Sequence, residues 1–254
     1  MLDALNSALS GMSANAKSIT VNANNVANLN TTGFKAAAAA ALADAPSAGM
    51  GGGGAVVSSI IPQMMQGGLM STGNPWDLAI GGGGFFTLKD QSGAMLYSRD
   101  GGFNVDAQGF VVNSQGMKLQ GITPQGAMAD LNVSQAGAAT GVSVDAQGFV
   151  NASFSDGRSQ TLGQVALSGF NAPQNLNSVG HNLYTATPAS GSAITGAPGT
   201  SGMGGIVSGS LEQSNVDLAS EFVNMISSQR AFEANAKTVS AESEMTREVL
   251  NLKA

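Results

Sequence analysis

The chain has 254 residues, of which only 10% are charged, and a formal net charge of −6 at pH 7. Soluble domains usually have about 25% charged residues, so much of this surface must be uncharged or covered by neighbours. The acidic balance argues against a protein that binds nucleic-acid phosphates. One histidine, His181, and no cysteine exclude a multi-histidine or thiolate metal site and a disulfide framework.

The sequence contains no segment typical of a membrane span or a cleaved secretory signal. Its longest apolar run, 36–43, has eight residues, whereas a membrane helix needs about 20. Asp3 lies where a secretory signal carries positive charge, and no apolar stretch follows it. We therefore expect no insertion into the membrane and, for an exported protein, a route without a cleaved signal peptide.

The N-terminal segment 1–35 carries a heptad pattern that predicts a long helix. Its apolar residues are separated by alternating steps of three and four, as in the a/d seam of a coiled coil. The seam consists of Leu2, Leu5, Leu9, Met12, Ala16, Ile19, Ala23 and Val26. The pattern stops at 28–33, which is rich in Asn, Thr and Gly, and Gly33 can adopt a left-handed conformation there.

The C-terminal segment 211–254 has the same kind of pattern and predicts a second helix, with Ser214 or Asn215 as its N-cap. The seam positions are Leu218, Phe222, Met225, Gln229, Phe232, Ala236, Val239, Ser243, Thr246 and Leu250. Both seams contain small or polar residues, so a pair of these helices alone would bury little apolar area. The pattern leaves two alternatives open: the helices require partner helices, or they pack on the central region.

Between the two ends, residues 76–210 read as a β-rich domain of short alternating runs separated by turn signals. The sequence Val-Asp-Ala-Gln-Gly-Phe-Val occurs at 105–111 and again at 144–150, which predicts two similar hairpins whose Phe enters the core. Residues 36–75 read as a Gly/Ala-rich extended linker, which we expect to be mobile in the monomer. The predicted fold class is α+β.

The motifs that could carry chemistry are weak. The run 49–54 fits G-x-G-x-x-G but lacks the preceding strand and following helix of a dinucleotide site, and 81–84 is typical of a bend before a strand. His181 has no acidic residue near it in the sequence and fits a turn or a surface position. We expect no catalytic, cofactor or metal site. A secreted hydrolase or binding module built on the β region remains a remote alternative.

Three segments resemble the signatures of the bacterial flagellar rod and hook proteins. The N-terminal one is Asn24–Lys35, with the sequence NNVANLNTTGFK. The central one consists of Asp77–Ile80, Gly84–Phe86 and Tyr97–Gly101, and the C-terminal one begins with LEQSNVDL at Leu211–Leu218 and continues to Phe232. The three occur in the family's order over nearly the whole chain.

This resemblance implies a structural protein and not an enzyme. In the family the terminal segments pair as an α-helical coiled coil that lines a tube, and the β domain lies further out. The implied partners are copies of the chain itself in a helical homopolymer, adjacent rod, hook and junction proteins, the flagellar export apparatus and the hook cap. The implied location is the flagellar hook or basal body, reached through type III export.

Within the family, we expect a compact hook-type subunit, with the distal rod protein as the alternative. Segments 113–121 and 162–167 are similar to hook proteins. Distal rod proteins carry an insertion after the N-terminal signature, and this chain shows no evident counterpart of that insertion. The short length, without an additional outer domain, favours a rod protein instead. The expected assembly interface consists of Leu5, Leu9, Met12, Ile19, Val26, Phe34, Phe222, Met225, Phe232 and Val239.

Overall fold

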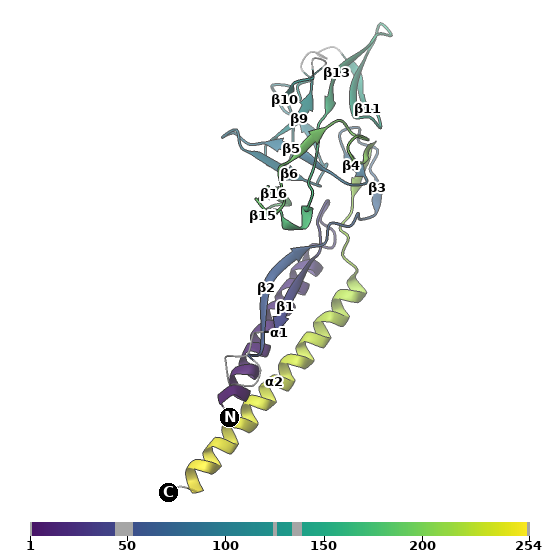
Figure 1. Ribbon diagram of the computed structural model, residues 1–254. Helices are drawn as coiled ribbons and strands as arrows, with labels where there is room; N and C mark the ends of the chain where they lie inside the picture. The colour runs from purple at the N-terminus through teal and green to yellow at the C-terminus, as the bar shows by residue number, and fades with distance from the viewer. Residues whose placement is uncertain (1, 44–52, 124–125, 134–138, 253–254) are drawn as a thin grey trace. The chain divides into compact units, whose positions relative to one another are not determined.

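The computed structural model describes residues 2–43, 53–123, 126–133 and 139–252 (Figure 1). The chain forms two compact units. The helical unit contains Met1–Leu29, Ala36–Gln63 and Val216–Ala254, and the β unit contains Asn30–Lys35 and Met64–Asn215. The segment expected as a linker, 36–75, is thus divided between the two units. Among the described residues, no helix is both long and apolar enough to cross a membrane.

The helical unit consists of two long helices and a hairpin. The helices are α1 (Leu2–Ala27) and α2 (Leu218–Leu252), and they contact each other, as the heptad patterns predict. Asp217, and not Ser214 or Asn215, caps α2: its Oδ1 accepts a hydrogen bond from Ala219 N at 3.0 Å. Asp217 also accepts a hydrogen bond from Ser220 Oγ on its other carboxylate oxygen. This hydrogen bond makes the largest contribution to lowering the pKa of Asp217, and the bonds from backbone N–H groups add to it.

The face that α1 turns inward differs from the predicted seam. Ala8, Ala14 and Val21 are buried, whereas Leu9 is 56% exposed. At Gly11 the helices approach so closely that a Cβ would lie 2.7 Å from Asn235 Nδ2. Small side chains let the two backbones come together, so the contact between α1 and α2 uses small residues and leaves several large apolar ones outside it.

A hairpin packs along α1 (Figure 1). Strand β1 (Ala37–Ala43) pairs antiparallel with β2 (Ala55–Pro62), in a register that starts at Ala37 opposite Pro62. Asn25 of α1 fixes its start, because its Nδ2 donates to Ala37 O at 2.8 Å and its Oδ1 accepts from Ala37 N at 3.0 Å. Much of the expected linker is therefore an ordered hairpin of the helical unit.

The β unit is built from antiparallel strands, as predicted. Counted over the described residues, its main sheet has thirteen strands, eight of which follow the order β11-β12-β13-β9-β5-β6-β16-β15. Two further pairs are β18-β4 and β19-β3, and a 3₁₀ turn, η2, covers Pro173–Asn175. The strands are β3 (Leu69–Ser71), β4 (Leu78–Gly81), β5 (Phe85–Lys89), β6 (Met95–Ser98), β7 (Asn104–Val105), β8 (Val111–Val112), β9 (Lys118–Ile122), β10 (Met128–Asp130), β11 (Ala139–Val144), β12 (Phe149–Phe154), β13 (Ser159–Val165), β14 (Leu167–Gly169), β15 (Asn177–Gly180), β16 (Leu183–Thr185), β17 (Ile194–Gly196), β18 (Gly205–Ser208) and β19 (Ser210–Glu212).

The two repeated segments form the same turn. Asp106 Oδ1 accepts from the backbone N of Gln108 and Phe110 at 2.9 and 2.8 Å. Asp145 repeats this geometry with its own following residues at 3.0 and 2.8 Å. The glycine of each turn has a φ above +80°, which favours glycine. The prediction that the Phe enters the core is wrong, because Phe149 is 39% exposed; the next residues, Val111 and Val150, are fully buried.

Gly101 allows two parts of the central signature to approach each other. Its carbonyl oxygen accepts a hydrogen bond from Leu78 N at 2.9 Å, and a Cβ at Gly101 would overlap Leu78 O and touch the ring of Phe86. We predict that Gly101→Ala lowers the free energy of unfolding of the β unit by about 2 kcal/mol or more. Urea denaturation followed by the fluorescence of Trp76, the only tryptophan and a neighbour of the β core, measures this.

Gly141→Ala is the matched control, because a Cβ at Gly141 would have nothing within 4 Å. Its expected effect is within about 0.5 kcal/mol. Equal effects of the two substitutions would contradict the proposed overlap.

Candidate functional site: the junction of the signature segments and the assembly surfaces

The three signature segments meet at one point inside the β unit. Lys35 comes from the N-terminal signature, Arg99 from the central one and Glu212, at the end of β19, from the C-terminal one. Their exposed fractions are 2%, 4% and 1%. Lys35 Nζ lies 2.6 Å from Glu212 Oε1, and Arg99 Nη1 lies 3.3 Å from Glu212 Oε2. We call these three residues the ion cluster.

Backbone groups complete the hydrogen bonding of the ion cluster. Glu212 Oε1 also accepts from Gly67 N at 2.9 Å, and Lys35 Nζ donates to Met65 O at 2.8 Å. The main chains join as well, because Gly33 N donates to Glu212 O at 2.7 Å. A buried ion pair is tolerated when such hydrogen bonds satisfy its remaining polar atoms. The ion cluster therefore fixes three chain segments that are far apart in the sequence.

Burial acts against both cations of the ion cluster. Burial lowers the pKa of Lys35, while the hydrogen bond and charge of Glu212 raise it. Burial also lowers the pKa of Arg99, again opposed by Glu212. The guanidinium lies over the ring of Phe85, with Cζ 5.3 Å from the ring centroid, which adds a cation–π attraction. With all three groups ionised, two positive charges share a single carboxylate.

A second set of polar contacts lies beside the ion cluster. Thr32 Oγ1 donates to Asp100 Oδ1 at 2.8 Å, and Asn182 Nδ2 donates to Thr32 O at 2.8 Å. Burial raises the pKa of Asp100, against the hydrogen bond from Thr32. Gly33 has a φ of +66°, as its predicted left-handed conformation requires, and a Cβ there would overlap the backbone of Asp100.

The motifs weighed for chemistry lie in turns where the structure describes them. His181 is exposed in the turn between β15 and β16, with a φ of 52°. Gly82 and Gly84 form the bend before β5, with φ values of +135° and +114°. Residues 49–52 of the other glycine run are outside the described residues. Within the described ranges, no group of three or more His, Cys, Asp or Glu side chains could hold a metal ion.

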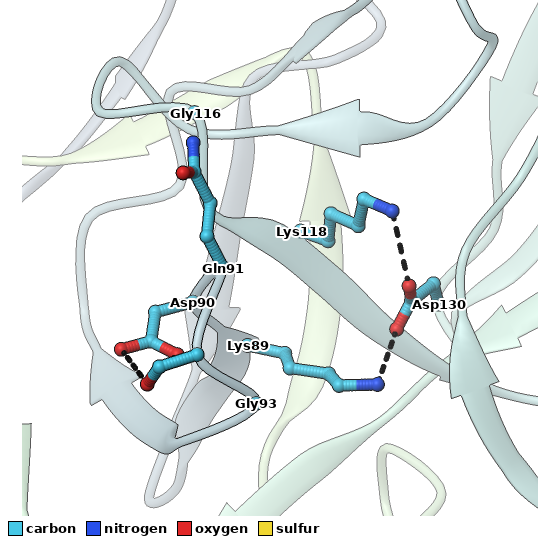
Figure 2. A pocket seen from close by; sticks show the side chains of 8 residues that line it. Lys89, Asp90, Gln91, Gly93, Gly116, Lys118 and Asp130 are labelled. Carbon is cyan, nitrogen blue, oxygen red and sulfur yellow. Dashed lines mark hydrogen bonds and ion pairs between the residues drawn. The ribbon is translucent and has the colours of Figure 1, made fainter.

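A hollow of about 450 Å³ lies at the β5–β6 turn (Figure 2). Lys89 and Lys118 approach Asp130 from two sides, with N–O distances of 3.4 and 3.3 Å. Burial would raise the pKa of Asp130, but hydrogen bonds from Gln120 and Lys118 and the two lysine charges outweigh it and lower the pKa. The carboxylate therefore stays ionised, and the hollow carries surface ion pairs that satisfy each other.

The structure divides the residues of the expected assembly interface into two groups. Leu9 and Phe222 are 56% and 47% exposed in the isolated chain. The others are half-buried: Leu5, Met12, Ile19, Val26, Phe34, Met225, Phe232 and Val239. Apart from Phe34, which belongs to the β unit, all lie in the helical unit. None of the ten is fully enclosed, so each retains surface that a neighbouring molecule could cover.

Two features of the structure do not follow from the sequence patterns. The first is the exposed apolar surface formed by Leu42, Val56, Ile60 and Ile61 on the hairpin and by Val223 and Ile226 on α2. The pairs Val56-Val57 and Ile60-Ile61 were its only signal. The second is the ion cluster, whose members Lys35 and Glu212 are separated by 177 positions. A charged residue inside each signature segment was the available hint.

Terminal helices with exposed apolar faces, and a β unit closed by a fully partnered carboxylate, are typical of a structural protein. Three family models match: "Flagella basal body rod protein" over residues 5–35, "Flagellar hook protein FlgE/F/G D1 domain" over 79–152, and "Flagellar basal body rod FlgEFG protein C-terminal" over 207–252. The chain belongs to the flagellar basal-body rod and hook protein family. It is a non-enzymatic subunit of the flagellar axial structure.

Individual relatives differ in how much of the chain they cover. The flagellar basal-body rod protein FlgG of Agrobacterium fabrum is 34% identical over 95% of this chain and 96% of its own. FlgG of Bacillus subtilis is 32% identical over the full length of both chains. The flagellar hook protein FlgE of Escherichia coli is 38% identical, but over only 43% of this chain and 27% of its own. The similarity to hook proteins is thus partial, contrary to our expectation of a hook-type subunit.

We predict that Glu212→Gln lowers the free energy of unfolding of the β unit by about 3 kcal/mol or more, because two buried cations lose their counter-charge. Urea denaturation followed by Trp76 fluorescence again measures this. Asp156→Asn is the control, since it removes a carboxylate from an exposed ion pair with Arg158 and should cost less than about 1 kcal/mol. A loss for Glu212→Gln no larger than that of the control would refute the role of the ion cluster.

Proposed function

We propose that the chain is the distal rod subunit of the flagellar basal body and that it polymerises into a segment of the tube that transmits motor torque. The observation that carries this proposal is how much of the chain each similarity covers. The similarity to the rod proteins FlgG of Agrobacterium fabrum, Borreliella burgdorferi and Bacillus subtilis spans 95–100% of this chain, whereas the similarity to the hook protein FlgE of Escherichia coli spans 43%. A hook-type subunit would be expected to align with hook proteins along the whole chain.

The hairpin of the helical unit supports the same proposal. Our expectation of a hook-type subunit rested partly on finding no counterpart of the rod-protein insertion after the N-terminal signature. Residues 37–43 and 55–62 follow that signature and form β1 and β2 along α1. The described strands are therefore structured in the place where an insertion was expected, which supports the assignment to a rod protein.

Apolar side chains that the helical unit leaves exposed support the proposed polymerisation. Leu9 on α1, Ile60 on the hairpin and Phe222, Val223 and Ile226 on α2 are all at least 47% exposed. Exposed apolar surface of this kind is typical of interaction sites. We propose that copies of this chain cover it, together with adjacent rod, hook and junction proteins at the two ends of the segment. Delivery through the flagellar export apparatus without a cleaved signal is part of the same proposal.

We predict that Leu9→Asp blocks polymerisation but leaves the monomer folded. The side chain is 56% exposed in the monomer, so the new charge stays hydrated until a neighbour covers it, where an unpaired charge costs several kcal/mol. Circular dichroism and sedimentation of the assembled polymer measure the two effects. Ser13→Asp, which adds the same charge at an exposed polar position of α1, should polymerise normally. Normal assembly of Leu9→Asp would exclude Leu9 from the interface.

Antibody labelling distinguishes the rod from the hook. We predict no label on intact cells and a label on the straight shaft after the outer envelope is opened. A label on the curved segment outside intact cells would replace the rod assignment with the hook assignment. A label on neither structure would contradict both.

A further inference from the structure

A pocket of about 220 Å³ in the β unit has Arg99 among its lining residues. The rings of Phe85 and Phe170, the side chain of Met203 and several backbone segments with glycine form much of the rest. The polar lining comes from Asn171 and Ser201, and none of the lining residues is acidic. Since a water molecule occupies about 30 Å³ in the liquid, the pocket has room for a small side chain and its carboxylate.

Most of the hydrogen-bonding capacity of Arg99 is unused. A guanidinium has five N–H donors, and that of Arg99 makes one hydrogen bond, from Nη1 to Glu212 Oε2 at 3.3 Å. Nε is buried without a hydrogen-bond partner. The side chain is only 4% exposed, so bulk water is a poor substitute. An unpaired buried donor of a charged group is costly, so an acceptor that reached the guanidinium through the pocket would stabilise it.

The charges of the ion cluster also favour an anion in this pocket. Lys35 and Arg99 share the single carboxylate of Glu212, and in the part of the chain that the structure describes no other carboxylate forms an ion pair with Arg99. Glu212 already accepts hydrogen bonds from Lys35 and Gly67 on Oε1. The ion cluster therefore carries one excess positive charge beside this pocket, where the attraction for an anion is stronger than in bulk water.

We propose that this pocket binds a carboxylate, which the Arg99 guanidinium receives with the donors that Glu212 leaves free. A planar carboxylate matches the fork of the guanidinium. The group comes from an Asp or Glu side chain of a second copy of this chain, which has 16 acidic against 10 basic residues. This source rests on the proposed polymerisation; the affinity of the pocket for a carboxylate does not. The pocket thus serves as the receiving half of a polar contact between subunits.

Titration of the full chain with sodium acetate tests the binding. The ¹⁵N-labelled protein is kept below the concentration at which it polymerises, and the Nε–H signal of Arg99, identified by its loss in Arg99→Lys, is followed by NMR. We expect a saturable shift with acetate and no such shift with sodium chloride at equal ionic strength. No saturable shift, or an equal shift with chloride, would overturn the proposal.

Two isosteric variants assign the site. Asn171→Asp places a carboxylate in the pocket lining and should weaken acetate binding at least tenfold. Asn104→Asp makes the same change at another exposed asparagine, in β7, and should bind acetate like the unsubstituted protein. Equal acetate affinities of the two variants would overturn the assignment to this pocket.

Polymerisation of the same two variants tests the source. We expect Asn171→Asp to polymerise at least tenfold more slowly than Asn104→Asp at equal protein concentration. Equal rates would overturn the second copy as the source and leave the pocket to free small carboxylates. Failure of the unsubstituted chain to polymerise under any condition would count against the proposed function, and it would leave the acetate result standing.

Discussion

The carboxylate of Glu212 holds together three segments that are far apart in the sequence. Within the β unit, residues 30–35 follow α1 in the sequence and residues 210–215 precede α2. The ion cluster therefore fastens these two connecting segments to each other and to Arg99. A broken backbone hydrogen bond costs about 1 kcal/mol, whereas removing one partner of a buried ion pair costs about 3–5 kcal/mol. The junction is therefore the place where single substitutions have the largest leverage on the β unit.

The closure of the β unit also gives the signature segments a physical meaning. Gly33 and Gly101 are positions at which a side chain would overlap backbone, and Thr32 and Asp100 hold each other by a hydrogen bond of 2.8 Å. Each signature thus contributes one charged residue to the ion cluster, and the N-terminal and central signatures also contribute the glycines that let the backbones approach.

Features of the fold that depend on residues close together in the sequence could be predicted, whereas features that depend on packing between distant residues could not. The two helices, the antiparallel hairpins and the repeated Asp turns at 106 and 145 follow from periodicity and turn chemistry, and the structure has all of them. The face of α1 that contacts α2 did not follow, because a heptad count finds the large apolar residues, whereas close contact is made at small ones such as Gly11. The hairpin was missed because its alanines have little strand preference, and its start is fixed by Asn25.

The two units differ in how they gain their stability. The β unit encloses an apolar core of large side chains that includes Phe86, Phe103, Leu88 and Leu119, and it adds the ion cluster to that core. Among the described residues, the helical unit contributes only Ala8, Ala14, Val21, Ala36 and Val216 to the buried apolar set. At about 25 cal/mol per Å² of apolar surface removed from water, so few and such small side chains hold the long helices weakly in a single chain. The large apolar residues that could strengthen the helical unit, among them Phe222 and Ile226, lie on its surface. Burial of these residues against a neighbouring molecule would therefore add stability to the helical unit, whereas the β unit already encloses an apolar core of its own.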